Sequence, residues 1–199
     1  MAPEQLEMTG MIETEALRLG RLTNRLLHTA RLTRDEVQPR LEPTDLTALV
    51  ARMVDQCRAE GQPVTLVVPE RPAEVASDPE LLALALIQLL DNAFKYAADG
   101  NAVAVRLELN QETASVHVTN HGSSIAFEEH ERIFDRFYRG VACRMSPGTG
   151  LGLYVARKIL TAHGGNLCLD DDGSTSNTTT FCASLPVLKT EARHVRKAS

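Results

Sequence analysis

Apolar and small side chains recur at three- and four-residue steps from Ile12 to Ala30, and arginines fill many of the positions between them. This spacing predicts an amphipathic helix of about 25–30 residues within residues 1–34. The apolar stripe needs a partner, so residues 12–30 are expected to pair in a coiled coil or bundle, for instance in a homodimer. The alternative is that the stripe packs on the chain's own domain.

The pattern beyond residue 34 changes from one long helix to a mixture of helices and strands. A polar stretch with two prolines, residues 35–43, predicts a linker, and residues 189–199 form a basic tail. Between them, helices are expected at 44–60, 78–98 and 151–163, and strands at 63–69, 102–109, 114–119, 166–170 and 179–185. Residues 44–188 are therefore predicted to form an α+β domain, a two-layer sandwich with helices on one face of a sheet.

Composition excludes several classes of protein. The 199 residues carry a formal charge of −5 and are 43% hydrophobic, which is typical of a soluble globular chain and argues against nucleic-acid binding. The longest apolar run, residues 81–90, falls short of the roughly 20 residues that a membrane span requires. The N-terminus lacks the features of a secretion signal. The four cysteines are scattered without metal-ligand spacing, which favours reduced thiols in a cytoplasmic protein.

Candidate chemistry begins on the expected helix 78–98. Gln88, Asn92, Lys95 and Tyr96 are three or four residues apart and therefore share one helix face. A side-chain amide oxygen is a suitable ligand for Mg²⁺, and a lysine can reach a phosphate. A solvated polar face is the alternative interpretation of the same spacing.

Two further segments place glycines in polar turns. Residues 120–125 (Asn-His-Gly-Ser-Ser-Ile) directly follow a predicted strand, and Gly122 would permit a close approach of the backbone. Residues 148–153 (Gly-Thr-Gly-Leu-Gly-Leu) lead into a helix, so their N–H groups and the helix start could face an anion. The spacing matches neither a P-loop nor a Rossmann fingerprint.

Together, in this order, the segments resemble the ATP-binding catalytic domain of bacterial sensor histidine kinases, in the gyrase, Hsp90, histidine kinase and MutL superfamily. Residues 91–96 look like the asparagine box of that family, 120–125 like its first glycine box and 148–153 like its second. Residues 131–140 look like its phenylalanine box. The first helix is similar to the second helix of the family's dimerisation and phosphotransfer hairpin. The resemblance implies a Bergerat-type ATP-binding fold.

The resemblance also implies roles in binding ATP and Mg²⁺. Asn92 would bind the metal with help from Gln88, and Lys95 would neutralise phosphate charge, which makes these three the candidate catalytic residues. Tyr96 would lie against the base or ribose, and Asn120 would meet the adenine amino group. Arg139 and Arg144 are candidates for the γ-phosphate. The other expected nucleotide contacts are Gly122, Ile125, Phe134, Phe137, Gly148, Thr149, Gly150, Leu151, Gly152, Leu153 and Thr180.

Three features of the sequence refine the expected function. ATP-hydrolysing members of the superfamily have a glutamate at the place of Gln88; a glutamine cannot act as a general base, which favours phosphotransfer over hydrolysis. Asn120 and Ser124 stand where the family has an aspartate and a glycine. No histidine followed by an acidic residue and a proline precedes the first helix, and His28 matches no acceptor motif. We interpret His28 as a surface histidine.

The sequence thus predicts a protein-histidine kinase fragment that transfers the γ-phosphate of Mg-ATP to a histidine outside this chain and is inactive in autophosphorylation by itself. Its partners would be a phosphoacceptor hairpin and a response regulator, with contact to a membrane only through other parts of a parent protein. One alternative is a degenerate nucleotide-binding or scaffolding module without phosphotransfer activity. Another is an anti-sigma-type serine kinase, which would not need the hairpin-like first helix.

Overall fold

The computed structural model describes residues 37–122, 124–140, 148–170 and 177–188. The chain divides into two units, Met1–Val37 and Gln38–Ser199, and the fold below is that of the second. The predicted helix and dimer contact at residues 12–30, Arg144 and the basic tail all lie outside the described residues.

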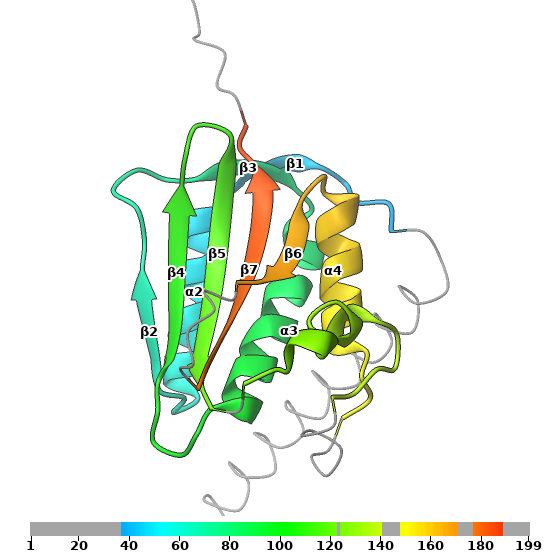
Figure 1. The fold of residues 1–199 in the computed structure, drawn as a ribbon. Helices are drawn as coiled ribbons and strands as arrows, with labels where there is room; N and C mark the ends of the chain where they lie inside the picture. The colour runs from blue at the N-terminus through cyan, green and yellow to red at the C-terminus, as the bar shows by residue number, and fades with distance from the viewer. Residues whose placement is uncertain (1–36, 123, 141–147, 171–176, 189–199) are drawn as a thin grey trace, which may run out of the picture. The chain divides into compact units, whose positions relative to one another are not determined.

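A five-stranded mixed sheet forms one layer of this unit (Figure 1). The strand order is β2-β4-β5-β7-β6; β2 runs parallel to β4, and the other neighbours are antiparallel. The strands are β2 (Val64–Val67), β4 (Val103–Leu109), β5 (Thr113–His121), β6 (Asn166–Leu169) and β7 (Thr178–Pro186).

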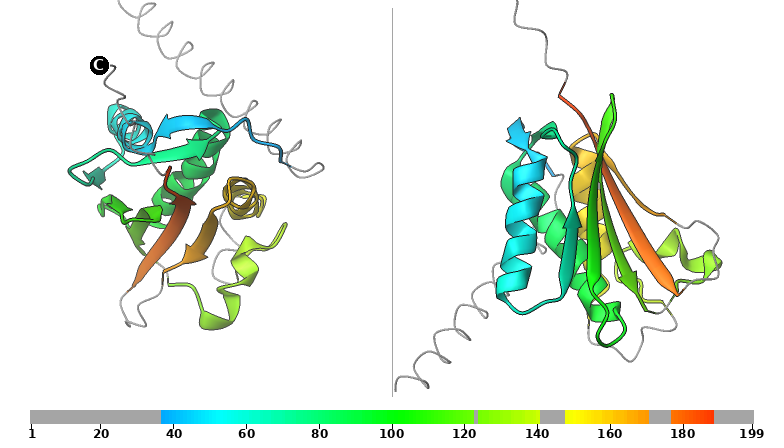
Figure 2. Two further views of the ribbon diagram at one scale, coloured as in Figure 1. Left: turned by 90° about the horizontal axis from the view of Figure 1, so that it is seen from above. Right: turned by 90° about the vertical axis from the view of Figure 1, so that its left-hand side faces the viewer.

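Three helices cover one face of the sheet: α2 (Leu46–Ala59), α3 (Pro79–Tyr96) and α4 (Gly152–Ala162) (Figure 2). Helix α3 starts as its sequence predicts, because Asp78 accepts a hydrogen bond from the Leu81 N–H and Pro79 occupies the first turn. Alternate residues of the long strands are buried against the helices. The predicted α+β two-layer sandwich is therefore confirmed.

A small second sheet was not expected from the pattern. Strands β1 (Glu42–Asp45) and β3 (Glu74–Ser77) pair antiparallel, and β1 begins inside the stretch expected to be a linker. Asp45 caps α2, because its carboxylate accepts a hydrogen bond from the Ala48 N–H. The two strands have only four residues each, so their pairing depends on contacts between distant parts of the chain.

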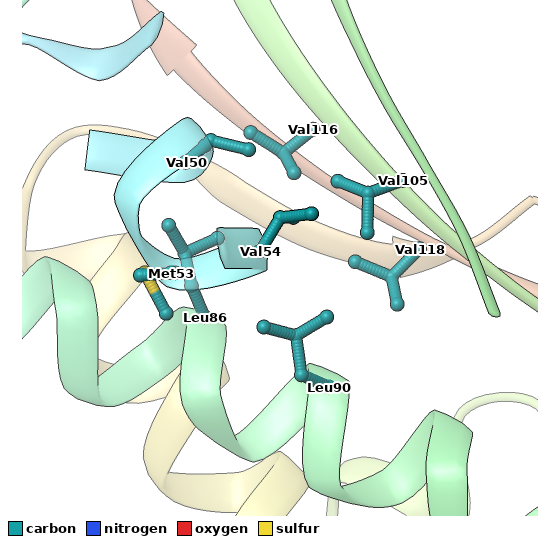
Figure 3. Close-up of a pocket in the computed structure, with 8 residues that line it drawn as sticks. All are labelled: Val50, Met53, Val54, Leu86, Leu90, Val105, Val116 and Val118. Atoms are coloured by element: carbon teal, nitrogen blue, oxygen red, sulfur yellow. The ribbon is translucent and has the colours of Figure 1, made fainter. Parts of the chain in front are cut away.

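A small gap lies in the core between α2, α3 and the sheet (Figure 3). Every side chain around it is apolar: Val50, Met53, Val54, Leu86, Leu90, Val105, Val116 and Val118. A lining without polar groups has nothing to bind a phosphate or a metal ion. This gap is a packing feature of the core, and the candidate chemistry lies elsewhere.

The connection between β5 and α4 contains the segment that resembles the phenylalanine box. Its described part holds two single-turn 3₁₀ helices, η1 (Phe127–Glu129) and η2 (Arg132–Phe134). Phe134 is buried, whereas Phe127 is 81% exposed. The segment is therefore attached to the domain through η2.

Candidate nucleotide site

The polar face of α3 forms one wall of the site. Gln88 and Asn92 are half-buried on this face and Lys95 is exposed, while Leu89 and Ala93 on the adjacent, core-facing side are fully buried. At the end of the helix, Nζ of Lys95 lies 4.7 Å from the centre of the Tyr96 ring. The amphipathic helix thus presents the predicted residues along one side, as their spacing of three and four residues requires.

The end of β5 packs directly on the C-terminal end of α3. Asn120 is only 1% exposed, and its Nδ2 donates to the Tyr96 carbonyl oxygen at 3.3 Å. Gly122 forms a bridge with Ala97, and a Cβ atom at Gly122 would lie 1.9 Å from the Tyr96 oxygen. Only glycine permits this approach, so residues 120–122 and the end of α3 form one unit.

The second glycine segment lies against the same face of α3. A Cβ atom on Gly152 would lie 2.7 Å from Oε1 of Gln88, and one on Gly148 would lie 2.9 Å from Nζ of Lys95. The side chains of Gln88 and Lys95 therefore lie close to the backbone of this segment. The distances bring the two predicted parts of the site together in space.

Helix α4 begins at this point without a side-chain cap. Leu151 occupies the cap position, and its apolar side chain makes no capping hydrogen bond. The N–H groups of the first turn of a helix lack partners within the helix and carry partial positive charge. Together with Lys95, this helix start makes the region favourable for a phosphate group.

The phenylalanine-box segment holds the glycine segment from the other side. The Phe137 N–H donates to the Gly150 carbonyl oxygen at 3.0 Å. Gly150 has a φ of +69°, and a Cβ atom there would lie 2.6 Å from the Tyr138 oxygen. Tyr138 is anchored in turn, because its hydroxyl donates to Glu129 Oε1 at 2.7 Å. The roles of Tyr138 and Glu129 were missed in the sequence: Glu129 belongs to no distinctive pattern, and Tyr138 was not singled out within residues 131–140.

Other predicted contact residues lie around this centre with partners of their own. Phe134 meets Phe181 edge to face, with 6.3 Å between ring centres, and the Arg157 guanidinium lies over its ring. Thr180 shares a hydrogen bond of 2.9 Å with Thr119 on the neighbouring strand. Phe137 is 60% exposed. These placements show Phe134 as an anchor of the segment and Phe137 at the surface.

A buried histidine links the two helices of the site. The Asp78 N–H donates to Nε2 of His163 at 3.0 Å, which leaves the proton on Nδ1 to be donated to the Ile159 oxygen at 2.7 Å. His163 stands at the end of α4 and Asp78 at the start of α3. The sequence shows six dispersed histidines, and only the packing of the helices identifies this one as structural.

A phosphate-favouring helix start beside a lysine and two side-chain amides, within a two-layer sandwich, defines a nucleotide-binding domain. The family described as histidine kinase-, DNA gyrase B-, and HSP90-like ATPase matches residues 77–189. The chain belongs to this family of ATP-binding domains. The family resemblance inferred from the sequence is confirmed.

Similar proteins within this family are named as sensor kinases or sensors, which narrows the functional class of the domain. The chain is 34% identical over 159 residues to the signal transduction histidine-protein kinase/phosphatase MprB of Mycobacterium avium (strain 104), which covers 78% of this chain and 30% of that protein. It is 34% identical over 168 residues to a probable sensor protein, PcoS, of Escherichia coli, with 80% and 35% covered. The chain thus spans about a third of the length of these relatives.

A solved structure of a mycobacterial sensor histidine kinase, MprB, has the same fold, with a TM-score of 0.66 and 31% identity. The aligned region covers 73% of this chain and 98% of the chain in that structure. We conclude that the described domain is the ATP-binding catalytic module of a two-component sensor kinase. None of the helices in the described segments is long and apolar enough to cross a membrane.

Proposed function

We propose that this chain binds Mg-ATP between α3 and the start of α4 and transfers its γ-phosphate to a histidine on a phosphotransfer hairpin. The observation that carries this proposal is the meeting of Gln88 with Gly152 and of Lys95 with Gly148, in front of the uncapped helix start. An anion held there would be close to a positive side chain and to free N–H groups.

The donor set on α3 fits a magnesium ion. Mg²⁺ is commonly held by one or two protein oxygens together with phosphate oxygens and water. Asn92 and Gln88 would provide amide oxygens one turn apart, and both are half-buried on the polar face. When bound, the ion would neutralise phosphate charge. Among the described residues there is no cluster of three or more His, Cys, Asp and Glu side chains that could hold a metal alone, so a phosphate-assisted site is the one that fits.

The side chains of the proposed site favour transfer of the γ-phosphate over hydrolysis of ATP. The Gln88 side chain of α3 lies beside the start of α4, and unlike a carboxylate it cannot remove a proton from water. Lys95 would bind and orient the phosphates, and Tyr96 and Asn120 would contact the base. Phosphoryl transfer depends mainly on positioning and on charge neutralisation, which these groups can supply.

The proposed partners are an acceptor hairpin, a response regulator and a second copy of the chain that pairs through residues 12–30. The relatives are named as signal transduction kinases or sensors, which supports partners of this kind. We propose that the module acts in the cytoplasmic part of a longer sensor.

The second candidate is a nucleotide-binding module without phosphotransfer. Asn120 favours it, because the amide is buried and donates to the Tyr96 backbone where the family has a carboxylate. Both candidates require nucleotide binding, so binding and transfer must be measured separately.

Titration calorimetry with ATP, in the presence and absence of Mg²⁺, tests the binding site. Asn92→Ala is expected to weaken binding of Mg-ATP more than binding of metal-free ATP. The matched control is Asn166→Ala, at an exposed position at the start of β6, which should bind like the wild type. Equal losses for both forms of the nucleotide would assign Asn92 a structural role and contradict its place at the metal.

A phosphotransfer assay separates the two candidates. The chain is incubated with γ-labelled ATP and a purified acceptor hairpin from a sensor histidine kinase. Acid-labile, base-stable label on the hairpin histidine supports transfer. Tight ATP binding without any label supports the scaffolding alternative and contradicts the kinase proposal.

A further inference from the structure

A row of polar and thiol side chains crosses the sheet on the face away from the helices. Arg106 of β4, His117 of β5, Cys182 of β7 and Cys168 of β6 are direct neighbours in the strand register. Adjacent residues such as Val116 point into the core, so the row faces the opposite side. Figure 1 shows this face of the sheet, with the helices behind it.

Cys168 and Cys182 stand directly opposite each other on antiparallel strands. The Asp170 N–H donates to the Thr180 oxygen at 2.8 Å, which marks that pair as hydrogen-bonded. Because such pairs alternate, Cys168 and Cys182, two residues along, form another, with Cα atoms about 5.5 Å apart. Disulfides bridge Cα separations of about 4.4–6.8 Å. The register alone therefore permits a bond between these thiols.

The side-chain contacts agree with the register. Sγ of Cys168 lies 3.8 Å from the backbone oxygen of Cys182, so it already leans over β7. Sγ of Cys182 lies 4.0 Å from Nε2 of His117. Both cysteines are free thiols in the structure.

The two thiols differ in accessibility and acidity. Cys168 is exposed and Cys182 is half-buried. Burial, together with the neighbouring Cys168 and Asp170, raises the pKa of the Cys182 thiol to about 11. An oxidant from solution therefore meets Cys168 first, and Cys182 remains protonated until its partner has reacted.

We propose that Cys168 and Cys182 form a modification site for low-molecular-weight disulfides, at which a mixed disulfide on Cys168 is resolved by Cys182 into a cross-strand disulfide. In the first step the Cys168 thiolate attacks one sulfur of the small disulfide, whose S–S bond breaks and releases one thiol. In the second, the Cys182 thiolate attacks Sγ of Cys168 and releases the other thiol. The proton of Cys182 is transferred to the leaving thiolate of the small molecule. The protein loses two electrons and two protons, and the small disulfide gains both.

The bond would connect the edge strand β6 to β7 and close the chain between them. Closing a loop restricts the unfolded chain, so the oxidised protein should resist unfolding more than the reduced one. The gain in stability on oxidation should be independent of nucleotide binding, because the row of side chains lies on the sheet face opposite the helices.

The test uses the full chain with Cys57→Ser and Cys143→Ser, which leaves only the pair. We expect glutathione disulfide to convert it to a monomer lighter by two hydrogens, with a linked peptide containing residues 168 and 182. The melting temperature should rise, and dithiothreitol should reverse the rise.

Two further variants serve as matched controls in the same background. Cys182→Ser should stop at the mixed disulfide and retain one glutathione on Cys168. Cys168→Ser should react far more slowly, because only the half-buried thiol remains. Retention of glutathione by the intact pair, covalent dimers as the main product, or no reaction at Cys168 would each overturn the proposal.

Discussion

The close contact between Gly122 and the end of α3 predicts a specific defect in Gly122→Ala. The new methyl group would begin 1.9 Å from the Tyr96 oxygen and 3.0 Å from its carbonyl carbon. Both are backbone atoms and cannot rotate away, so the end of β5 must move from the helix. The hydrogen bond from the Ala98 N–H to the His121 oxygen, 2.6 Å long, lies at the same junction.

Overpacking of a close-packed site costs about 1–3 kcal/mol, and a lost hydrogen bond adds about 0.5–1.5 kcal/mol. We therefore expect the free energy of unfolding of Gly122→Ala to fall by roughly 2–4 kcal/mol. The separation of Asn120 from Tyr96 should also weaken ATP binding by about ten-fold, equivalent to about 1.4 kcal/mol. Urea unfolding followed by circular dichroism and calorimetric titration with Mg-ATP measure the two effects.

Gly61→Ala is the matched control. Gly61 has a φ of +79°, but a Cβ atom there would meet nothing within 4 Å. The left-handed backbone costs about 1–2 kcal/mol for a residue other than glycine, and ATP affinity should not change. Wild-type stability and affinity of Gly122→Ala would refute the argument from close approach. A similar loss of affinity in both variants would show that general destabilisation is the cause.

Four other predictions concern the helices and the sheet of the same domain. Leu89→Ala in the fully buried side of α3 should lower the free energy of unfolding by about 2–5 kcal/mol in urea titrations; a change below 1 kcal/mol would place Leu89 outside the core. His163→Ala leaves the half-buried Asp78 N–H without its acceptor and should cost about 1–3 kcal/mol, whereas an unchanged melting temperature would mean that the link between the helices is dispensable. At pH 8, iodoacetamide should modify Cys182 far more slowly than Cys168, because its raised pKa keeps it protonated. Equal rates of alkylation would contradict this order. The same shift predicts that the free energy of unfolding falls as the pH rises from about 9 to about 11, since the thiol ionises first in the unfolded chain.

Helix α3 and its polar face could be predicted because the relevant information is local. Asp78 and Pro79 define the first turn, and the spacing of Gln88, Asn92 and Lys95 fixes their common side. Neither feature depends on the rest of the fold. The same is true of the hairpin formed by β4 and β5, whose residues alternate between buried and exposed positions.

The small sheet of β1 and β3 could not be predicted in the same way. Its two strands have four residues each and are separated by α2 and β2 in the chain. The Leu46 and Ala73 backbones hydrogen-bond across this separation, with 2.9 Å from N to O. Such strands are specified by their partners in space more than by their own side chains.

The glycine segments were identified by sequence, but the reason for their glycines is tertiary. Gly122 makes room for the Tyr96 carbonyl group, and Gly152 for the Gln88 amide. Neither pair is close in sequence. A pattern of glycines therefore indicates that some backbone approaches closely, and only the fold shows which group occupies the space.

Asn120 illustrates how a departure from the family pattern can have a structural reason. An ionised carboxylate has only acceptor oxygens, whereas the Asn120 amide also donates, and here it donates to the Tyr96 oxygen. The bond joins the end of β5 to the same helix end that carries Lys95 and Tyr96. Because the NH₂ group is engaged by the backbone, the amide is held with its oxygen as the remaining acceptor. An adenine amino group needs only an acceptor, so the amide can join strand to helix and still keep the group that base recognition requires.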